Sequence, residues 1–460
     1  MNMFSSTNKI HFVGIGGIGM SGIAEILLDQ GFNITGSDKT KTSVTERLEM
    51  LGATIFEGHR AKNIPSDTDI LVYSSAVPID NPEVKEAEKR AIPVVRRAEM
   101  LAEVMRLKFG IGIAGTHGKT TTTSMVSSVL IEGDLDPTVI VGGKLSALGG
   151  TNARLGQGEF IVVEADEYDR SFLALMPTIV VLTTMEEDHM DIYKDFEDIR
   201  SAFAQFANKV PFYGFIVICA DEVSLRSIIP EMKKKKMVTY GIKHQADLMA
   251  KNLRYRQNLS IFDLIYKNKN LGEIKIKVPG RHNISNSLAA IAVGLGLDIP
   301  MDKIKKGIEN FTGVYRRWEM KGERNGVVVY DDYAHHPTEC AASIEGAKGG
   351  WKNRVICVFQ PHLYSRTKDL YKEFANSLIS ADILIITDVY PARETPIRGI
   401  SGELIAKEAI RLGHKETFYL KNKEKVPDFL NRIAIRGDMV VTMGAGDIYK
   451  YGEEFLGLKK

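Results

Sequence analysis

A glycine-rich segment at residues 115–122 has the residue types that bind nucleotide phosphates. It reads Gly-Thr-His-Gly-Lys-Thr-Thr-Thr, between an apolar run at 109–114 and an apolar stretch that continues to about residue 131. This order predicts a strand, a turn and a helix whose first amides and dipole hold phosphate oxygens. Lys119 is expected to reach the β- and γ-phosphates of ATP, and the Thr120 hydroxyl to ligate Mg²⁺. The predicted ATP contacts of this segment are Gly115, Thr116, Gly118, Lys119, Thr120 and Thr121.

The segment departs from the strict phosphate-loop pattern GxxxxGK[ST]. Ile113 stands where that pattern has its first glycine. A chance glycine-rich turn before a helix is therefore the alternative. The apolar strand before the turn and the apolar helix after it favour the phosphate loop.

A carboxylate follows the next apolar run. Residues 160–163 are Phe-Ile-Val-Val, Glu164 comes directly after them, and Asp166 and Glu167 lie just beyond. A carboxylate at the carboxyl end of a strand beside a phosphate loop is well placed to hold Mg²⁺. We predict that Glu164 is a metal ligand, while Asp166 or Glu167 could instead cap the following turn.

A second cluster of candidate ligands follows the run at 178–184. Residues 186–191 contain four acidic side chains and His189. A phosphoryl-transfer site gains from two cations, which neutralise charge on the transferred and leaving groups. His189 is therefore a second predicted metal ligand and catalytic residue.

The N-terminal sequence Gly14-Ile15-Gly16-Gly17-Ile18-Gly19 fits the pattern GxGxxG, and Asp38 lies 19 residues past Gly19. Read alone, this is the fingerprint of a dinucleotide site, which would indicate an NAD-dependent oxidoreductase. The loop recognises a diphosphate, however, and a UDP-sugar has one too. The separate triphosphate loop favours a nucleotide-sugar site, in an enzyme or in a binding protein without catalysis.

Short β-branched runs alternate with helical segments along the whole chain and must position these residues. The runs are apolar on both faces, which predicts parallel sheets covered by helices and an α/β fold. We expect three domains, at residues 1–107, 108–313 and 314–460: Rossmann-like, ATPase-like with the phosphate loop, and Rossmann-like again. Segment 247–278 alternates polar and apolar residues and predicts a small antiparallel excursion in the middle domain.

Composition excludes several classes of protein. The 460 residues are 44% hydrophobic and 26% charged, with a net charge of +2, so neither nucleic acid nor an anionic membrane is an expected partner. Three cysteines without CxxC spacing make a disulfide framework improbable and fit a reducing cytoplasm. Neither a signal peptide nor a membrane-spanning run is visible, so we expect a cytoplasmic protein, a monomer or a homodimer.

The motifs, taken in order, resemble those of the Mur ligase family of cell-wall synthesis over essentially the whole chain. No single motif suffices, but the ordered set is specific: GIGGIGMSGIAEIL (14–27), TGSD (35–38), SSAV (74–77), GTHGKTTT (115–122), VVEADEYDRSF (162–172), EEDHMD (186–191), PGRHNISNSLAAIAV (279–293), RRWE (316–319), DDYAHHPTE (331–339), FQPHLYSRT (359–367) and GAGDI (444–448). The opening GIGGIGMSG is most similar to the alanine-adding branch.

The resemblance implies an ATP- and Mg²⁺-dependent ligase acting on UDP-N-acetylmuramate and L-alanine. ATP would phosphorylate the lactyl carboxylate, and the amine of alanine would attack the acyl phosphate. A free carboxylate does not accept an amine at neutral pH, so phosphorylation supplies the leaving group while the protein aligns the reactants and neutralises charge. A murein peptide recycling ligase, which attaches a whole peptide to the same sugar, is the nearest alternative.

The resemblance also implies roles for residues of the middle and last domains. Lys119 and Thr120 match the phosphate and Mg²⁺ contacts, and Glu164 and His189 match the metal ligands. His282 and Asn283 match a pair around the adenine, although Asn283 and Ser285 could instead cap a helix at 286–296. Asp332 matches an acid that reaches the ribose, and Arg316 or Arg317 an arginine that contacts phosphate.

In the last domain, His335, His336, His362 and Arg366 are expected to face the cleft and to handle the acyl phosphate or alanine, with only one of the adjacent histidines pointing inward. Catalytic roles are predicted for Lys119, His189, His335 and Arg366. In the first domain, the predicted contacts to the UDP-sugar are Gly16, Gly17, Ile18, Gly19, Asp38, Ser74 and Ser75, with His362 as a further substrate contact.

Three positions depart from the family pattern. Residues 200–206 contain no lysine where several relatives have a carbamylated one, which leaves a second metal less firmly held. Leu363 stands where arginine is common, and Met185 where asparagine is common. Contacts from these positions are therefore not expected.

Overall fold

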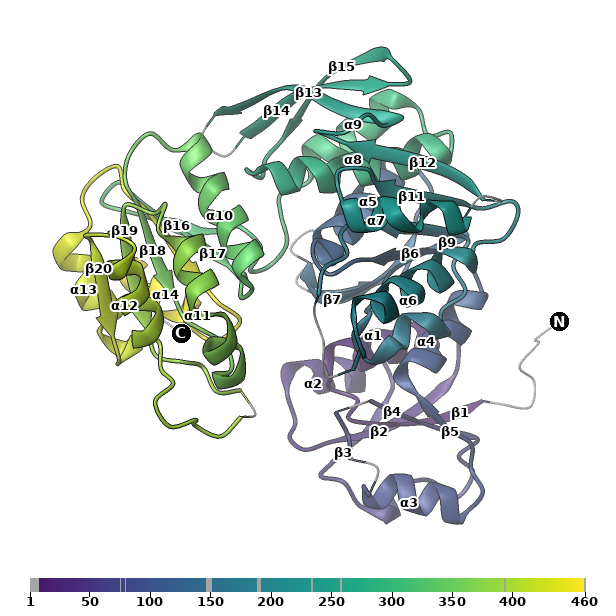
Figure 1. Cartoon of the computed structure of the whole chain (residues 1–460). Helices are drawn as coiled ribbons and strands as arrows, with labels where there is room; N and C mark the ends of the chain where they lie inside the picture. Colours follow the sequence, from purple (N-terminus) through teal and green to yellow (C-terminus); the bar gives the residue numbers. More distant parts are fainter. Residues whose placement is uncertain are drawn as a thin grey trace. The chain divides into compact units, whose positions relative to one another are not determined.

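Figure 1 shows a computed structural model of the whole chain, which describes residues 8–74, 76–78, 80–145, 151–187, 192–232, 235–256, 259–392 and 394–458, without the side chains of residues 18, 142–145 and 151–152. Its contacts group the chain into two compact units. The first contains residues 1–249, 266–269 and 286–308; the second contains residues 250–265, 270–285 and 309–460. Among the described residues, no helix combines the length and the apolar character needed to span a membrane.

The first unit begins with a five-stranded parallel sheet in the order β3-β2-β1-β4-β5. The chain crosses from one side of β1 to the other after β3, so the strands next to β1 diverge at its carboxyl end. Ligands of open α/β sheets bind at such a switch point. The elements are β1 (Lys9–Val13), α1 (Ile18–Asp29), β2 (Asn33–Asp38), α2 (Ser43–Met50), β3 (Thr54–Glu57), β4 (Ile70–Tyr73), α3 (Pro82–Lys89), β5 (Val94–Arg96) and α4 (Arg97–Arg106).

The second sheet of this unit has β6 (Phe109–Ala114) between β9 (Phe160–Glu164) and β10 (Ile179–Leu182), all parallel. Ile111 and Val162 are fully buried because helices cover both faces. Since the three strands run the same way, the residues that follow them meet at one edge. The remaining elements are α5 (Lys119–Glu132), β7 (Thr138–Leu145), β8 (Thr151–Arg154), α6 (Phe196–Asn208), β11 (Phe215–Cys219), α7 (Val223–Ile228) and β12 (Lys236–Gly241).

A meander of β13 (Leu248–Arg256), β14 (Leu259–Tyr266) and β15 (Lys269–Ile276) follows. Leu248 and Met249 still pair with β12, whereas most of the meander belongs to the second unit. Lys267 and Asn268, the two residues between β14 and β15, both have positive φ, as in the tight turn of an antiparallel hairpin. This turn fits the predicted antiparallel excursion, and its assignment to the middle domain stays a prediction.

The second unit contains a six-stranded sheet in the order β16-β17-β21-β18-β19-β20, in which only the β16–β17 pair is antiparallel. Alternate residues of its strands are buried in two separate cores, one under α10, α11 and α12 and one under α13 and α14. The elements are β16 (Glu319–Arg324), β17 (Val327–Asp332), α10 (Pro337–Gly350), β18 (Val355–Phe359), α11 (Tyr364–Leu378), β19 (Ile383–Thr387), α12 (Glu403–Arg411), β20 (Thr417–Leu420), α13 (Val426–Ile433), β21 (Met439–Met443) and α14 (Tyr449–Leu456).

The predicted α/β class is confirmed: three domains each have a mainly parallel sheet flanked by helices. The glycine clusters after Val13, Ala114 and Met443 follow β1, β6 and β21. The exact boundaries at 107 and 313 stay predictions.

One helix differs from its prediction. Helix α8 runs from Arg281 to Gly296, followed by α9 (Met301–Asn310), so Asn283 and Ser285 lie within its first five residues and do not precede it. Gly280 has φ of +101° and changes the chain direction directly before Arg281. The expected start at residue 286 was wrong because this glycine, and not a polar cap, begins the helix.

Candidate active site

The loop between β6 and α5 is shaped by two glycines. Gly115 has φ of +147°, and a Cβ there would lie 2.0 Å from Thr183 Oγ1. Gly118 has φ of +82°, and a Cβ there would lie 2.7 Å from Asn286 Oδ1. Side chains are therefore excluded at both positions by conformation and by space. This leaves the backbone of the loop open for phosphate oxygens at the N-terminus of α5.

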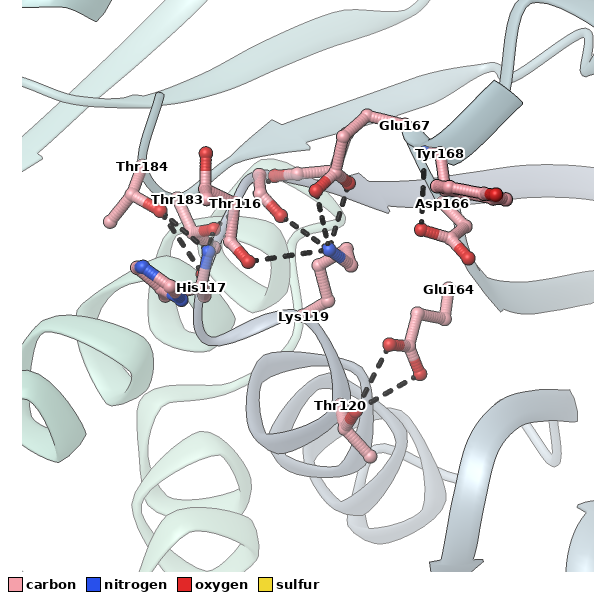
Figure 2. Close-up of polar contacts among 12 residues, drawn as sticks. Thr116, His117, Lys119, Thr120, Glu164, Asp166, Glu167, Tyr168, Thr183 and Thr184 are labelled. Carbon is pink, nitrogen blue, oxygen red and sulfur yellow. Dashed lines mark hydrogen bonds and ion pairs between the residues drawn. The ribbon is translucent and has the colours of Figure 1, made fainter. Parts of the chain in front are cut away.

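Residues after β10 hold this loop in place. The amide of His117 donates to Thr184 Oγ1 at 2.8 Å, and the Thr183 hydroxyl donates to the carbonyl of His117 at 2.6 Å. The amide of Thr116 donates to the carbonyl of Thr184. Figure 2 shows these contacts on one side of the loop. The loop conformation is thus fixed by the neighbouring strand end, as a preorganised phosphate site requires.

Lys119 is the first residue of α5, and its ammonium is enclosed by acceptors. Its Nζ lies 2.8 and 3.0 Å from the two carboxylate oxygens of Glu167 and 2.7 Å from the carbonyl oxygen of Gly115 (Figure 2). Only 13% of the Lys119 side chain and 4% of the Glu167 side chain are exposed. Burial by itself lowers the pKa of Lys119, but the nearby carboxylates of Glu167, Asp166 and Glu164 outweigh it and raise that pKa, so the lysine stays charged.

Thr120 and Glu164 meet directly. The Thr120 hydroxyl lies 3.0 and 3.1 Å from the two carboxylate oxygens of Glu164 (Figure 2). The strand register explains this, because Ile113 pairs with Glu164 and brings the end of β9 beside the start of the loop. A hydroxyl and a carboxylate that converge are hard oxygen donors, the set that Mg²⁺ prefers. The third predicted ligand, His189, lies outside the described residues.

Glu167 is the site residue that the sequence analysis undervalued, since there it was only a candidate turn cap. It follows β9 and directly precedes the 3₁₀ segment Tyr168–Ala174, in which Asp169 and Arg170 have positive φ. Its position three residues after Glu164 was a usable signal. Because Glu167 follows the same strand as the predicted metal ligand Glu164, its carboxylate can reach the same glycine-rich loop.

The N-terminal glycine motif forms the turn between β1 and α1. The amide of Gly16 donates to Asp38 Oδ2 at 2.8 Å, so the predicted acid at the end of β2 contacts the motif itself. A Cβ on Gly19 would lie 2.8 Å from an Arg97 guanidinium nitrogen. Ser74 directly follows β4, and Ser75 lies outside the described residues.

Two predicted residues lie in the first turns of this unit's helices, and one cation beside the glycine motif was not predicted. Ile18 is the first residue of α1 and Thr121 lies in the first turn of α5, where amides have no partner within the helix. Arg97, at the start of α4, lies against Gly19 but is 78 positions away in the sequence, so no local spacing indicated it.

In the second unit, the two arginines of the RRWE motif differ. The Arg316 guanidinium is buried and donates to Asp331 Oδ2 at 2.8 Å and to the carbonyls of Gly444 and Gly446. The Arg317 side chain is 31% exposed and lies 3.2 Å from Glu339. Of the two, Arg317 is therefore more accessible to a ligand, and either phosphate contact stays a prediction.

Asp332 ends β17 and is buried. Its carboxylate accepts hydrogen bonds from the Ser343 hydroxyl at 2.8 Å and from the amide of Ala334 at 3.0 Å. Burial raises the pKa of Asp332 to about 6, against the lowering effect of Arg317. Near the start of α8, the Asn283 amide donates to the carbonyl of Pro279 at 2.7 Å, and His282 is exposed.

The structure brings His335 and His362 together, with their ring centroids 5.9 Å apart. Burial lowers the pKa of His335, and Glu339, 3.4 Å from its Nδ1, opposes this shift, while the charge of Arg366 adds to it. His336 lies at the N-cap of α10. Leu363 has φ of +69°, so the chain is strained between His362 and α11, which carries Arg366.

Comparisons with known proteins cover the three domains in turn. Residues 9–109 match the family model described as Mur ligase family, catalytic domain; residues 113–294 match the Mur ligase middle domain; and residues 316–446 match the Mur ligase, glutamate ligase domain. None of these three describes a nicotinamide oxidoreductase.

The chain is 53% identical to the UDP-N-acetylmuramate–L-alanine ligase of Geotalea uraniireducens, with 98% of each chain covered. It is 50% identical to the enzyme of the same name from Geobacter sulfurreducens, over 99% of this chain and 98% of that one. The crystal structure of UDP-N-acetylmuramate-alanine ligase MurC from Thermotoga maritima is 30% identical, with a TM-score of 0.82 and 98% of both chains covered. The chain belongs to the Mur ligase family.

Proposed function

We propose that this protein joins L-alanine to the lactyl carboxylate of UDP-N-acetylmuramate, with cleavage of ATP to ADP and phosphate. The main observation that supports this proposal is the glycine-rich loop, which lies with Lys119, Thr120 and Glu164 at one edge of the sheet. It lies in a chain that is 53% identical, over nearly its whole length, to a ligase named for that reaction.

The chemistry fits this site. A carboxylate oxygen attacks the γ-phosphorus and ADP leaves, which converts a carboxylate into an acyl phosphate. The alanine amine then attacks the carbonyl carbon, phosphate leaves with the bonding pair, and the nitrogen loses a proton to give the amide. Both steps move negative charge onto phosphate oxygens. Lys119 and the loop amides supply preorganised positive charge and donors for those oxygens.

A divalent cation fits beside this charge. Thr120 and Glu164 would hold Mg²⁺ through oxygen atoms that already converge, and His189 is the predicted further ligand. When bound, Mg²⁺ would neutralise part of the charge on the transferred phosphoryl group. The crystal structure of a MurF ligase from Thermotoga maritima in complex with ADP has a similar fold, with a TM-score of 0.65. Its sequence is only 16% identical, so this similarity supports the common fold alone.

The other residues predicted to contact the substrates come from all three domains. The motif at Gly16–Gly19, with Asp38, is proposed to hold the UDP diphosphate and ribose, and Ser74 and Ser75 the sugar. His282, Asn283 and Asp332 are proposed to contact adenine and ribose, with Arg317 or Arg316 on phosphate. His335, His362 and Arg366 are proposed to handle the acyl phosphate or alanine. Cys219, Cys340 and Cys357 are buried and are not joined in disulfides, which fits the cytoplasm as the compartment.

The alternative function that an experiment must distinguish from alanine addition is that of a murein peptide recycling ligase. A murein peptide ligase from Psychrobacter arcticus is only 23% identical, with a TM-score of 0.69, so it supports the fold and not the acceptor. The distinguishing experiment measures phosphate release with UDP-N-acetylmuramate, ATP and Mg²⁺ against L-alanine, glycine, L-serine and the peptide L-alanyl-γ-D-glutamyl-meso-diaminopimelate.

L-alanine is expected to give the highest kcat/KM, by about 10- to 200-fold over glycine or serine, because one small group is worth about 1–3 kcal/mol in a pocket. Preference for the peptide would instead establish the recycling activity. Absence of phosphate release with every acceptor would contradict a ligase of either kind.

A further inference from the structure

The ion pair between Lys119 and Glu167 occupies the place where the proposed nucleotide phosphates need the lysine. Both carboxylate oxygens lie within 3.0 Å of Nζ, and the carbonyl oxygen of Gly115 accepts a further hydrogen bond from Nζ at 2.7 Å (Figure 2). The two side chains are almost fully enclosed. The ammonium is therefore satisfied by the protein itself, and a phosphate oxygen has to compete for it.

The position of Glu167 is built into the fold. Its carbonyl accepts a hydrogen bond from the hydroxyl of Tyr193 at 2.6 Å, and Tyr193 is buried. Arg170 lies over the ring of Tyr193 at 5.0 Å and forms an ion pair with Asp198 on α6. The turn that carries Glu167 contains two non-glycine residues at positive φ, a conformation that costs energy and persists only when its surroundings impose it.

This arrangement has an electrostatic consequence. Glu167 cancels much of the positive charge of Lys119, and it adds a buried negative charge next to Asp166 and Glu164 at the site of an anionic ligand. Like charges in a weakly screened site repel strongly. A nucleotide without a cation meets this repulsion undiminished, whereas a nucleotide with a divalent cation brings compensating charge.

We propose that Glu167 is a positioning residue that competes with the nucleotide phosphates for Lys119, holding the lysine in the nucleotide-free site and making tight nucleotide binding dependent on a divalent cation. The inference rests on the proposed function, because it assumes that ATP binds this loop. A competing role and a purely structural role for Glu167 predict opposite changes in nucleotide affinity when the residue is substituted. Loss of a structural contact weakens ligand binding, whereas loss of a competitor strengthens it.

The test measures the affinity of the full-length protein for ADP by calorimetry, in EDTA and in saturating Mg²⁺. Glu167→Gln and Glu167→Met remove the charge, and Glu167→Asp keeps it on a shorter side chain. Glu25→Gln is the matched control, because Glu25 is a buried glutamate paired with an arginine, Arg47, on the first sheet's helices. Thermal unfolding of each variant reports whether it folds.

Removal of the charge is expected to tighten ADP binding in EDTA about tenfold or more, and to shrink the gain on adding Mg²⁺ by a similar factor. Glu167→Asp and Glu25→Gln are expected to bind ADP as the wild type does. If Glu167→Gln and Glu167→Met both bind ADP in EDTA no more tightly than the wild type does, the inference is overturned, while the proposed function stays intact. Absence of ADP binding by the wild type in Mg²⁺ would overturn the proposed function, and this inference with it.

Discussion

The hydroxyl of Thr120 lies 3.0 and 3.1 Å from the two carboxylate oxygens of Glu164, which joins the first turn of α5 to the end of β9 (Figure 2). Only one of these contacts at a time can carry the single hydroxyl proton. Three oxygen atoms thus converge at the edge of the sheet, beside the ammonium of Lys119. That convergence supports the proposed cation site next to the glycine-rich loop.

Glu164→Gln is expected to raise the Mg²⁺ concentration for half-maximal phosphate release at least about tenfold, because a neutral amide oxygen is a weaker ligand than a carboxylate. The matched control is Glu159→Gln. Glu159 precedes β9, at the opposite end of the same strand, and is exposed. An Mg²⁺ titration of both variants decides this, and an unchanged response in Glu164→Gln would remove that residue from the metal site.

Lys119→Ala is expected to reduce phosphate release by at least about a hundredfold, since it removes the charge that faces the phosphates. The same change leaves Glu167 buried without its cation, so the unfolding free energy should fall by up to about 3–5 kcal/mol. Adding Glu167→Gln should restore stability but not activity. Urea unfolding and the phosphate assay, run on the single and double variants, separate the two effects. Substantial turnover by Lys119→Ala would refute the site assignment.

Gly118→Ala is expected to weaken nucleotide binding about tenfold or more, because its Cβ would lie 2.7 Å from Asn286 Oδ1 and would distort the loop. Gly52→Ala, after α2, is the matched control: Gly52 also has positive φ, +106°, but no atom lies within 4 Å of its Cβ. Both variants should lose about 1–2 kcal/mol of stability from the left-handed backbone. Calorimetric titration with ADP should distinguish them, and equal affinities would show that space at residue 118 is irrelevant to binding.

Asp332 gives a prediction on pH. Its pKa rises from an ordinary value of 3.8 to about 6 in the folded domain, so the folded state binds the proton more tightly than the unfolded chain. Stability contributed by this group is present at acid pH and is lost as pH rises from about 4 to about 6. Asp332→Asn should therefore be more stable than wild type at pH 7 by on the order of 1–3 kcal/mol, but not at pH 4.5.

Urea unfolding of the wild type and Asp332→Asn at the two pH values checks this. Asp382→Asn is the control in the same domain, because Lys348 and the amide of Val355 lower the pKa of Asp382 against the effect of burial. That group keeps its stabilising effect down to about pH 4, so Asp382→Asn should be destabilised equally at both pH values. If the unfolding free energies of the wild type and Asp332→Asn differ by the same amount at both pH values, the raised pKa of Asp332 is contradicted.

Strand positions and the approach of Thr120 to Glu164 could be predicted from the sequence because they depend on local patterns. The run before Glu164 is apolar on both faces, so it could be assigned to a buried parallel strand, and the position of its last residue then followed. The spacing after the GxGxxG motif singled out Asp38, which ends β2 and contacts Gly16.

Other features depend on contacts that no local pattern encodes. Glu167 contacts Lys119, 48 positions away, from the start of a turn in which Asp169 and Arg170 have left-handed backbone. Arg97 reaches Gly19 only because α4 packs near α1 in the folded unit. The start of α8 was misplaced because polar residues inside a first turn look like caps before it.

The central claim is that ATP activates the lactyl carboxylate at this loop. The most direct test uses UDP-N-acetylmuramate with both carboxylate oxygens labelled with ¹⁸O, together with ATP, Mg²⁺ and L-alanine. Transfer of one oxygen to phosphorus and retention of the other in the amide predict one ¹⁸O in each released phosphate, measured by mass spectrometry. Phosphate that is released in step with the amide but carries no ¹⁸O would contradict an acyl phosphate and, with it, the account of the site.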